Sequence, residues 1–387
     1  MKLHKTVTIL GSTGSVGRST VDLISGHRDK FRVRALTANK NFRLLARQAR
    51  ELHAEYAVIA DETLYGDLKD ALAGTAVKAE AGHKAVVTAA GIPADWVMAA
   101  IVGAAGVEST LRAIQQGTTV ALANKESLVC AGPFMMEAVQ KHGTILLPVD
   151  SEHNAVFQVL SADQRAQVKR IVLTASGGPF LRKTREELLK VTPEQAVKHP
   201  TWSMGAKISV DSATMMNKSL EIIEASYLFK LKSEEIEVLI HPQSIVHSMV
   251  EYIDGSILSQ MGAPDMRTPI AHTLAWPERM ATTGDTLNLL NNFHLYFEPI
   301  DLKRFPAIKM AREVLQTGGA APIMFNAANE VAVAAFLARK LKFTAVETIV
   351  AEVLRTMPIQ PVTNLQEVFN IDQNARRIAS MAIAGVK

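Results

Sequence analysis

The sequence predicts an α/β protein whose first part is a doubly wound parallel sheet, whose middle is an α/β catalytic domain with a mixed sheet, and whose end is a helical bundle. Three observations predict this class. Apolar strands alternate with helical stretches over the first 150 residues, a hairpin signal follows, and four amphipathic stretches end the chain. A chain of 387 residues is too long for one ordinary core, so we expect two or three domains.

Composition narrows the class of function. The chain has 48% hydrophobic and 21% charged residues, which is typical of a soluble globular protein. No apolar run could span a bilayer, and no basic block carries interleaved aromatic residues, so we expect neither a membrane nor a nucleic-acid partner. The net charge of +4 is scattered and suits anionic small molecules. A single cysteine, Cys130, and a start without a leader segment predict a cytoplasmic protein.

A glycine-rich turn follows the first predicted strand, at 5–10. Gly11, Gly14 and Gly17 are spaced G-x-x-G-x-x-G and lead into a helical pattern at 18–25. This order is typical of a dinucleotide site, because glycines let the backbone approach a pyrophosphate and the helix start offers N–H groups. The alternation continues through a helix at 42–52 and predicts a Rossmann-like sheet, with further strands at 31–37, 57–60, 96–102 and 118–123.

The end of the second strand favours NADP over NAD. Proteins that bind NAD usually place a carboxylate there to hold the ribose 2′-hydroxyl, and this chain has Asn39, Lys40 and Asn41 instead. Lys40 would attract a 2′-phosphate, and the asparagines could donate hydrogen bonds to it. The alternative is that Lys40 and Asn41 only begin a helix.

Three polar residues, Asn124, Lys125 and Glu126, follow the apolar strand at 118–123. Ligands of doubly wound sheets lie at the carboxyl ends of the strands. These residues are therefore candidates for the nicotinamide and substrate end of the site. They could equally begin a helix, with Asn124 as its cap.

Residues 211–221 put a hydroxyl, a carboxamide, an ammonium and a carboxylate on one short element. In a helix, with about 100° between residues, Asn217, Lys218 and Glu221 share one face. Ser212 falls on the opposite side, so we expect it at the N-cap. A helix start with Ser, Asn and Lys predicts a phosphate site. The alternative is a surface helix with a capping Ser and a Lys-Glu pair.

Three acidic side chains predict a divalent metal site. Asp150 and Glu152 follow a strand predicted at 143–149, and in extended chain they would point the same way. Two carboxylates so close together repel each other unless a cation lies between them. With Glu221 they supply three oxygen ligands, which suits Mg²⁺ or Mn²⁺. The alternative is a solvated loop with an Asp cap.

Ser176, Gly177 and Gly178 follow another predicted strand, at 169–174. A Ser-Gly-Gly turn after a strand is a plausible anion nest, and it is also an ordinary turn. Further on, Thr192 and Gln195 have the spacing of a capping box at a helix start.

The loop at 196–206 predicts a lid that closes over a substrate and excludes water. It carries a histidine, two large apolar side chains and a hinge candidate, namely His199, Trp202, Met204 and Gly205. The alternative is that Trp202 and Met204 only anchor the loop to the core.

The next stretch predicts a hairpin. Residues 243–253 alternate in polarity, Asp254-Gly255 indicates a type I′ turn, and residues 256–261 return. The middle sheet is therefore expected to be mixed. His247, in the first strand of the hairpin, is interpreted as structural.

The C-terminal part is predicted to be helical after a linker at 276–301. Capping boxes are expected at Thr344 and Thr363. Three polar residues inside an apolar stretch are interpreted as contacts within the bundle or at an interface, and not as catalytic groups: Asn326, Asn329 and Glu330. The predicted helices are at 305–317, 322–340, 344–357 and 363–384.

Taken together, these motifs resemble the 1-deoxy-D-xylulose 5-phosphate reductoisomerase family nearly end to end. Two positions differ from the family pattern: Val16 stands where isoleucine is usual, and Asn39 where glycine is common. The matching motifs are Gly11-Ser-Thr-Gly-Ser-Val-Gly17, Asn124-Lys-Glu126, Leu147-Pro-Val-Asp-Ser-Glu-His-Asn154, Ala175-Ser-Gly-Gly-Pro-Phe180, His199-Pro-Thr-Trp-Ser-Met-Gly205 and Lys207-Ile-Ser-Val-Asp-Ser-Ala-Thr-Met-Met-Asn-Lys218.

The resemblance implies roles for individual residues. Cofactor contacts would be Thr13, Gly14, Ser15 and Val16 at the pyrophosphate, Asn39, Lys40 and Asn41 at the 2′-phosphate, and Asn124, Glu126 and Gly205 elsewhere. The metal ligands would be Asp150, Glu152 and Glu221, which with Lys125 are the catalytic residues. Substrate contacts would be Lys125, Ser151, Glu152, Ser176, His199, Ser212, Asn217, Lys218 and Glu221, and the lid would carry His199, Trp202 and Met204.

The resemblance also implies an activity and an organisation. A homodimer would rearrange 1-deoxy-D-xylulose 5-phosphate, by retro-aldol and aldol steps or by an α-ketol shift. It would then reduce the product with NADPH to 2-C-methyl-D-erythritol 4-phosphate, with Mg²⁺, Mn²⁺ or Co²⁺ as the metal. The alternatives are another NADP-dependent sugar-phosphate or semialdehyde dehydrogenase and a non-enzymatic NADP(H)-sensing module. The expected parts are an NADPH-binding domain at 1–150, a catalytic and connective domain at 151–275, a linker at 276–301 and a helical domain at 302–387.

Overall fold

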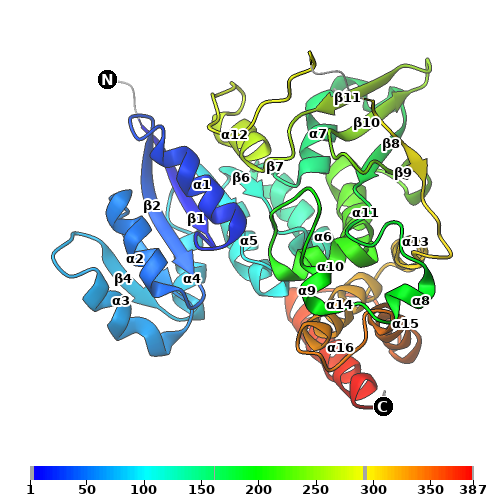
Figure 1. Cartoon of the computed structure of the whole chain (residues 1–387). Coiled ribbons are helices and arrows are strands. Elements are labelled where there is room, and N and C mark those ends of the chain that lie inside the picture. Colours follow the sequence, from blue (N-terminus) through cyan, green and yellow to red (C-terminus); the bar gives the residue numbers. More distant parts are fainter. Residues whose placement is uncertain (1–3, 161, 291–293, 386–387) are drawn as a thin grey trace. The chain divides into compact units, whose positions relative to one another are not determined.

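The structure, a computed structural model, describes residues 4–160, 162–290 and 294–385. The chain forms two compact units, each assembled from separate segments (Figure 1). Unit 1 comprises Met1–Ser127, Met135–Asn154 and Asp265–Asp285, and unit 2 comprises Leu128–Phe134, Ala155–Pro264 and Thr286–Lys387. The finer division at residues 150, 275 and 301 stays a prediction, and residues 291–293 of the predicted linker lie outside the described residues.

Unit 1 is built on a seven-stranded parallel sheet with the strand order β4-β3-β2-β1-β5-β6-β7. The order reverses between β1 and β5, and ligands of doubly wound sheets bind at such a reversal. The strands are β1 Lys5–Leu10, β2 Phe31–Ala38, β3 Tyr56–Ile59, β4 Lys78–Ala81, β5 Trp96–Ala99, β6 Thr119–Leu122 and β7 Ile145–Pro148.

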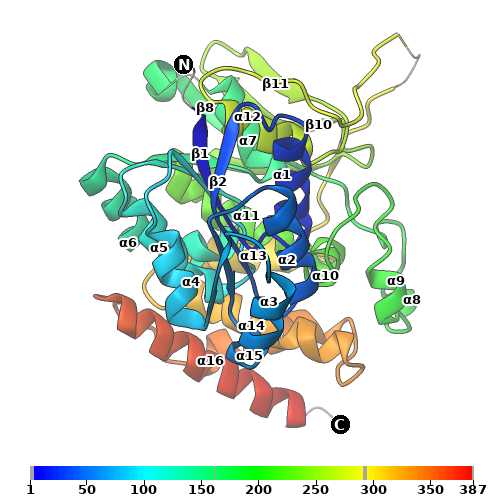
Figure 2. The same cartoon turned by 90° about the vertical axis from the view of Figure 1, so that its left-hand side faces the viewer.

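Helices cover both faces of this sheet (Figure 2). The central strands are therefore apolar without alternation, as Val7, Ile9 and Trp96 illustrate, since each is fully buried. The helices of the unit are α1 Ser15–Ser25, α2 Phe42–Glu51, α3 Tyr65–Ala71, α4 His83–Ala90, α5 Val107–Ile114, α6 Lys125–His142 and α12 Arg267–Ala275.

Helix α6 is kinked in its middle. Ala131 leaves helical geometry, with φ −133° and ψ 26°, two residues before Pro133. A proline inside a helix lacks the N–H donor and its ring clashes with the preceding turn, which explains the break. The kinked segment, Leu128–Phe134, belongs to unit 2, whereas both ends of α6 belong to unit 1.

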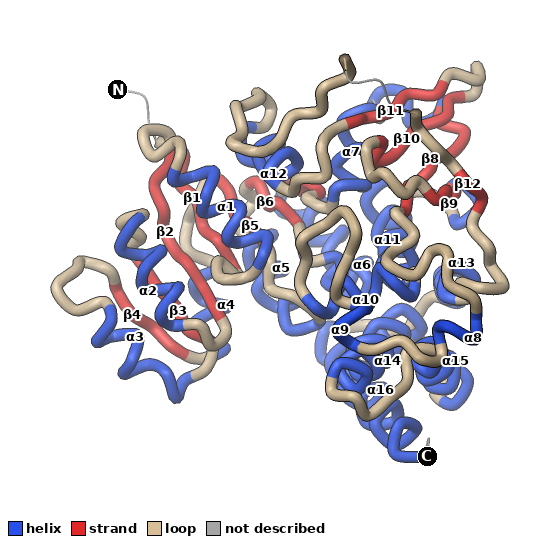
Figure 3. Tube along the Cα trace, viewed as in Figure 1, coloured by secondary structure: helices blue, strands red, loops and turns tan. Residues whose placement is uncertain are grey.

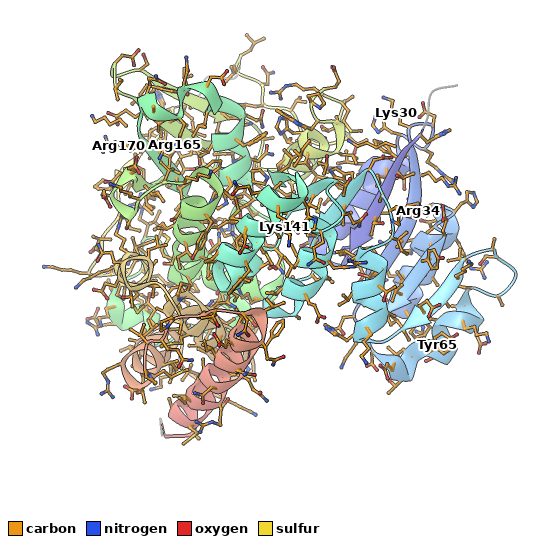
Figure 4. All side chains as sticks on the ribbon, turned by 180° about the vertical axis from the view of Figure 1, so that it is seen from behind. Lys30, Arg34, Tyr65, Lys141, Arg165 and Arg170 are labelled. Carbon is orange, nitrogen blue, oxygen red and sulfur yellow. The ribbon has the colours of Figure 1, made fainter. Side chains whose placement is uncertain are left out.

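Unit 2 contains a five-stranded mixed sheet with the order β11-β10-β8-β9-β12. Among the described residues of this sheet, β8 and β9 form the only parallel pair. The strands are β8 Val168–Ala175, β9 Ile236–Ile240, β10 Val246–Tyr252, β11 Ile257–Met261 and β12 Glu298–Pro299. Charged side chains pair across the sheet surface: Lys169 and Arg170 on β8 both contact Glu251 on β10. Figure 4 labels Arg170 among the side chains of this unit.

The helices of unit 2 include α7, which begins in unit 1 at Ser151. Among the last four helices, α14 contacts both α15 and α16 (Figure 3), so the predicted helical end of the chain is confirmed. The helices are α7 Ser151–Val159, α8 Arg185–Leu188, α9 Pro193–Ala196, α10 Ala206–Thr214, α11 Met216–Phe229, α13 Ala307–Thr317, α14 Ala321–Leu337, α15 Ala345–Thr356 and α16 Leu365–Gly385.

Several local predictions differ from the structure. Strands β4, β9 and β12 are absent from the sequence prediction, and β12 lies within the predicted linker. Strand β4 is an edge strand with the polar sequence KAEA, so only its pairing with β3 identifies it. The predicted hairpin is present, but its turn is not type I′, because Gly255 has φ +86° while Asp254 does not have a positive φ. Instead, a three-residue loop is closed by Tyr252 and Ser256, whose N–H and C=O are 2.9 Å apart.

The predicted helix caps have mixed outcomes. Gln195 accepts a hydrogen bond from the backbone N–H of Thr192, as expected. Thr344 has helical dihedral angles and no capping bond, so that prediction is wrong. The cap of α16 is shifted by one residue, because Asn364 and not Thr363 accepts from the N–H of Glu367.

Candidate active site

The turn between β1 and α1 in unit 1 requires glycine at two positions. A Cβ on Gly11, which has φ +85°, would lie 2.6 Å from the carbonyl oxygen of Ala100, and a Cβ on Gly17 would lie 2.2 Å from the carbonyl oxygen of Gly11. Ser12 points inward, with its hydroxyl bonded to Gln48. The backbone therefore lies directly at the reversal between β1 and β5, with Gly14 and Ser15 exposed at the start of α1. A phosphate can reach helix N–H groups in such a turn.

The residues that follow β2 are exposed, as a contact to a 2′-phosphate requires. The side-chain oxygen of Asn41 caps α2 by accepting from the N–H of Leu44, so its amide NH₂ is the group left for a ligand. Lys40 has a neighbour that the sequence reasoning missed: its Nζ is 4.0 Å from Asp61, at the end of β3. Hydrogen bonds from Thr63 hold the pKa of Asp61 below its usual value, so this carboxylate is ionised beside Lys40.

Asn124 begins α6, which confirms the cap alternative for this residue. Its side-chain oxygen accepts from the N–H of Ser127, and its NH₂ donates to the carbonyls of Ile101 and Gly103. The side chain thus ties the loop after β5 to the start of α6. Glu126, in the first turn of the same helix, is buried.

A buried ion pair joins the ends of two neighbouring strands, β6 and β7. The ammonium of Lys125 contacts a carboxylate oxygen of Asp150, and the side chains are only 6% and 10% exposed. Parallel strands end at the same edge of the sheet, which is why residues 25 positions apart meet here. The pair places one cation and one anion at the edge where the ligand is expected.

Asp150 and Glu152 do not lie in extended chain, so the geometry predicted for them is wrong. Helix α7 begins at Ser151, and the N–H of Glu152 donates to Asp150 at 3.3 Å. The polar pattern after β7 is that of a helix start, where a carboxylate satisfies free N–H groups. Ser151 donates its hydroxyl proton to the carboxylate of Glu152.

The Ser176 loop of unit 2 is held by His199. The Ser176 hydroxyl is 2.8 Å from Nε2 of His199, while Nδ1 accepts from the backbone N–H groups of Thr201 and Trp202 at 3.1 and 3.0 Å. An Nδ1 that accepts twice carries no proton, so Nε2–H is the donor to Ser176. Burial lowers the pKa of His199 to about 4, so the ring is neutral at physiological pH.

Of the other predicted lid residues, Trp202 and Met204 are half-buried, and Gly205 is exposed. The ring of Trp202 lies 5.9 Å from that of His247, centroid to centroid, so His247 contacts the predicted lid. Gly205 precedes α10 with φ −64°, a conformation open to any residue, and nothing in the described chain crowds it. Closure of this loop stays a prediction.

Ser212 is not a helix N-cap, and this prediction is wrong. It lies in the last turn of α10, and Met215 adopts the left-handed conformation, with φ +62°, between α10 and α11. Met215 is buried in the core of unit 2, which holds this conformation in a residue that rarely adopts it. The predicted single element is therefore two helices joined by a strained residue.

The first turn of α11 confirms the grouping of three predicted residues. The side chains of Asn217 and Lys218 both donate to the carboxylate of Glu221, and Lys218 and Glu221 are fully buried. The interpretation as an exposed Lys-Glu pair is excluded by this burial. Buried charges persist where they are paired and hydrogen-bonded.

The Ser176 loop and Ser212 are in direct backbone contact. Gly178 has φ +65°, and a Cβ added there would lie 2.9 Å from both the carbonyl oxygen of Ser212 and the Cα of Ala213. Unit 2 thus gathers the predicted substrate residues Ser176, His199, Ser212, Asn217, Lys218 and Glu221, whereas Lys125, Asp150, Ser151 and Glu152 belong to unit 1.

Models of one protein family match most of the chain. The 1-deoxy-D-xylulose 5-phosphate reductoisomerase model matches residues 7–132, the C-terminal domain model of that family matches 146–229, and the DXP reductoisomerase C-terminal domain model matches 261–378.

Individual relatives carry the same name. The 1-deoxy-D-xylulose 5-phosphate reductoisomerase of Rhodospirillum centenum is 57% identical over 380 residues, covering 98% of this chain and 94% of that protein. Its counterpart in Zymomonas mobilis is 56% identical over 376 residues, covering 97% of both chains.

Solved structures with this name share the fold. The Zymomonas mobilis enzyme in complex with NADPH has a TM-score of 0.93 and 54% identity, covering 98% of this chain and 99% of that one. A DOX-P reductoisomerase in complex with NADPH, fosmidomycin and magnesium has a TM-score of 0.93 and 42% identity, covering 98% of each chain.

Proposed function

Because this chain belongs to the 1-deoxy-D-xylulose 5-phosphate reductoisomerase family, we propose that the residues described above carry out that family's reaction here. The chain is an NADPH-dependent oxidoreductase with 1-deoxy-D-xylulose 5-phosphate reductoisomerase activity. We expect it to produce 2-C-methyl-D-erythritol 4-phosphate, with one NADPH oxidised to NADP⁺ for each substrate rearranged. The observation that supports the assignment of roles is the pair of buried lysine–carboxylate contacts, Lys125 with Asp150 and Lys218 with Glu221.

The cofactor site is proposed at the turn after β1. Thr13, Gly14, Ser15 and Val16 would meet the pyrophosphate at the start of α1, and Asn39, Lys40 and Asn41 would meet the 2′-phosphate. Two relatives of known structure bind NADPH, which supports this assignment. Glu126 and Gly205 are proposed to contact the rest of the cofactor. Asn124 would do so through its backbone, because its side chain is engaged within the protein.

The metal ligands are proposed to be Asp150, Glu152 and Glu221. Oxygen donors suit a divalent cation such as magnesium, which is present in three related structures. The residues fit this role, because Asp150 and Glu221 already accept a cation as a partner: Lys125 contacts Asp150, and Lys218 contacts Glu221. When bound, the cation would polarise the carbonyl and the adjacent hydroxyl of the substrate as a Lewis acid.

Around that centre, the protein is proposed to orient and neutralise the substrate. Lys125 would place its ammonium near the reacting hydroxyl and assist proton or charge movement there, with Ser151 beside it. NADPH would supply the hydride that reduces the rearranged aldehyde.

The phosphate of the substrate is proposed to bind in unit 2. Ser176, Ser212, Asn217 and Lys218 offer hydroxyl, amide and ammonium donors, and His199 fixes the hydroxyl of Ser176. Binding energy from this remote group can be used to close the loop at 196–206, with Trp202 and Met204 excluding water from the reacting carbons.

Glu152→Gln tests the metal assignment. It should lower turnover by about two or more orders of magnitude while NADPH binding stays near wild type, because removing a metal ligand withdraws Lewis-acid stabilisation from the transition state. The measurement is NADPH oxidation at 340 nm with 1-deoxy-D-xylulose 5-phosphate, with and without a chelator, alongside a Mn²⁺ titration.

The same assay separates the alternatives. A plain NADP-dependent dehydrogenase would keep its activity after treatment with a chelator, and a sensing module would bind NADPH without turnover. Unchanged turnover of Glu152→Gln would remove this residue from the metal site.

A homodimer is proposed from the edge of the mixed sheet. Strand β11 pairs only with β10 in the described chain, and it exposes Ile257, Leu258 and Met261 by 55%, 48% and 40%. Apolar edge strands are commonly covered by another chain. Light scattering should then measure the mass of a monomer for Leu258→Lys and the mass of a dimer for the wild-type protein. A wild-type protein with the mass of a monomer would contradict the proposal.

The compartment is also a proposal. None of the helices in the described part of the chain has the length and hydropathy of a membrane-crossing helix. We infer a cytoplasmic location from the single cysteine and the need for reduced cofactor, and cell fractionation would test it.

A further inference from the structure

An amide on the C-terminal helical part of unit 2 holds a carboxylate next to a proposed substrate residue. Asn329 on α14 is fully buried, and its Nδ2 donates to Oδ1 of Asp211 on α10 at 2.9 Å. The other oxygen of Asp211 is 2.8 Å from Nζ of Lys207, one turn earlier on α10. The carboxylate, only 1% exposed, also fixes the orientation of the amide, since rotation would turn the amide oxygen toward a negative charge.

Asp211 lies close to the junction at Met215 between α10 and α11, and the proposed phosphate contacts lie on either side of this junction. Asp211 directly precedes Ser212, and its carbonyl shares the hydroxyl proton of Thr214, at 3.2 Å, with the carbonyl of Val210, at 3.1 Å. That hydroxyl in turn accepts from the N–H of Met216, the first residue of α11, at 3.3 Å. Asn217 and Lys218 follow immediately, so the position of Asp211 is transmitted to all three proposed contacts.

The junction needs such an anchor because its backbone is strained. Met215 has φ +62°, a conformation that persists in a non-glycine residue only where the surroundings impose it. Without a fixed last turn of α10, α11 could rotate relative to Ser212, and the phosphate donors would no longer point to one place. Buried polar contacts of this kind specify one arrangement among several.

We propose that Asn329 is a positioning residue for substrate binding: by holding Asp211, it aligns Ser212 with Asn217 and Lys218 around the phosphate. This inference rests on the proposed phosphate-binding role of those three residues. Asn329 is fully buried and is not among the proposed substrate or cofactor contacts, so it would act on substrate affinity through α10.

The chain offers a matched control on the same helix. Asn326, one turn before Asn329, is also a fully buried asparagine of α14, but its amide contacts Glu330 at 2.9 Å and the sulfur of Cys130 at 3.4 Å. Replacing either residue with leucine removes a buried amide of similar size from the same helix. Of the two changes, only the one at position 329 removes a hydrogen bond from Asp211.

The experiment measures steady-state kinetics of the full-length enzyme with inorganic phosphate as a competing probe. Asn329→Leu should raise the KM for 1-deoxy-D-xylulose 5-phosphate and the inhibition constant for phosphate about tenfold. The KM for NADPH should stay within about twofold, because no proposed cofactor residue lies on α10 or α11. The kcat should change less than the substrate KM, because the bonds from Asn217 and Lys218 to Glu221 lie within α11. Asn326→Leu should leave all four constants near wild type.

Two further variants keep the test decisive. If the leucine variant does not fold, Asn329→Ser replaces it in the test. Serine keeps a shorter donor, so the substrate KM should rise above the wild-type value by less than about tenfold. Lys218→Ala tests the proposed phosphate site itself: if it leaves the substrate KM unchanged, the proposed function of these residues fails. If Lys218→Ala raises the KM but Asn329→Leu does not, or raises it no more than Asn326→Leu, the positioning role of Asn329 is overturned.

Discussion

His199 carries two contacts on one ring, and they can be separated by substitution. Its Nε2–H reaches Ser176, while its Nδ1 satisfies two backbone N–H groups of the loop. Glutamine places an amide where Nε2 lies, and asparagine places an oxygen where Nδ1 lies. The ring thus links the Ser176 turn to the loop at 196–206 through ordinary hydrogen bonds between neutral groups.

We expect His199→Asn to retain more activity than His199→Gln. The glutamine variant loses the Nδ1 acceptor, which leaves two backbone N–H groups unsatisfied. The asparagine variant loses only the bond from Nε2–H to Ser176, so the kcat/KM values of the two variants should differ by about tenfold. The measurement is kcat/KM for 1-deoxy-D-xylulose 5-phosphate between pH 6 and 8. With a pKa of about 4, His199 should add no pH dependence in that range. Equal losses in the two variants would contradict the importance of the Nδ1 contacts.

At the scale of elements, the proposed phosphate site depends on how closely two segments approach. The Ser176 loop packs its backbone against α10 at Gly178, where the added Cβ would meet Ser212 and Ala213. This contact occurs between main-chain atoms, which cannot move aside as a flexible side chain can. The spacing between the Ser176 and Ser212 segments is therefore fixed by a glycine.

Gly178→Ala should destabilise unit 2 and raise the substrate KM. Gly143 is the matched control, because its φ of +67° is nearly that of Gly178 and nothing lies within 4 Å of an added Cβ. Gly143→Ala should cost only the left-handed strain, about 1–2 kcal/mol, with an unchanged KM. Thermal unfolding and kinetics would check both. A Gly178→Ala enzyme with the stability and KM of Gly143→Ala would show that the close approach is unimportant.

At the scale of the whole molecule, buried titratable groups shape the dependence of stability on pH. Burial raises the pKa of Glu347 to about 8, although the backbone N–H of Ala307 partly offsets this. Burial lowers the pKa of His199 and of His272 to about 4, with Arg279 also lowering that of His272. The histidines stabilise the fold above pH 6.5, and their contribution is lost as the pH falls toward 4. Glu347 has the opposite effect, because its raised pKa lowers the stability of the fold as the pH rises.

Glu347→Gln should stabilise the protein most at alkaline pH. Between pH 4.5 and about 8 the unfolded chain has an ionised Glu347 while the folded chain keeps the proton, so the free energy of unfolding falls as the pH rises. The variant should remove this loss, which is on the order of a few kcal/mol above pH 8. Urea unfolding at pH 5 and pH 9 measures it.

Glu352→Gln is the control for this experiment, because Glu352 lies on the same helix and its pKa is held low by Arg355 and Thr356. It should not stabilise the protein at either pH. A Glu347→Gln variant with equal effects at pH 5 and pH 9 would contradict a raised pKa.

Much of the fold could be predicted from local pattern. Hydrophobic periodicity and turn residues correctly indicated the glycine turn, the alternating strands and helices, and the four C-terminal helices. These signals are local, because backbone sterics and the burial of one face depend on residues that are close in sequence. Two failures lie where distant partners decide: β4 is identified by its pairing with β3, and Met215 is held left-handed by the core. A third failure is local, because Asp150 and Glu152 belong to a helix start that was predicted as extended chain.

The sequence by itself determined which chemical groups are present and which short segments carry them, since residue type and spacing fix chemistry and local conformation. Only the tertiary structure decided the pairings, such as Lys125 with Asp150, Lys40 with Asp61 and Asn329 with Asp211. The partners in these contacts lie 21 to 118 residues apart, so a short segment of sequence does not predict that they are in contact. Chain topology brings them together, and burial then makes each contact strong, because charges and amides shielded from water depend on the partners that the fold provides.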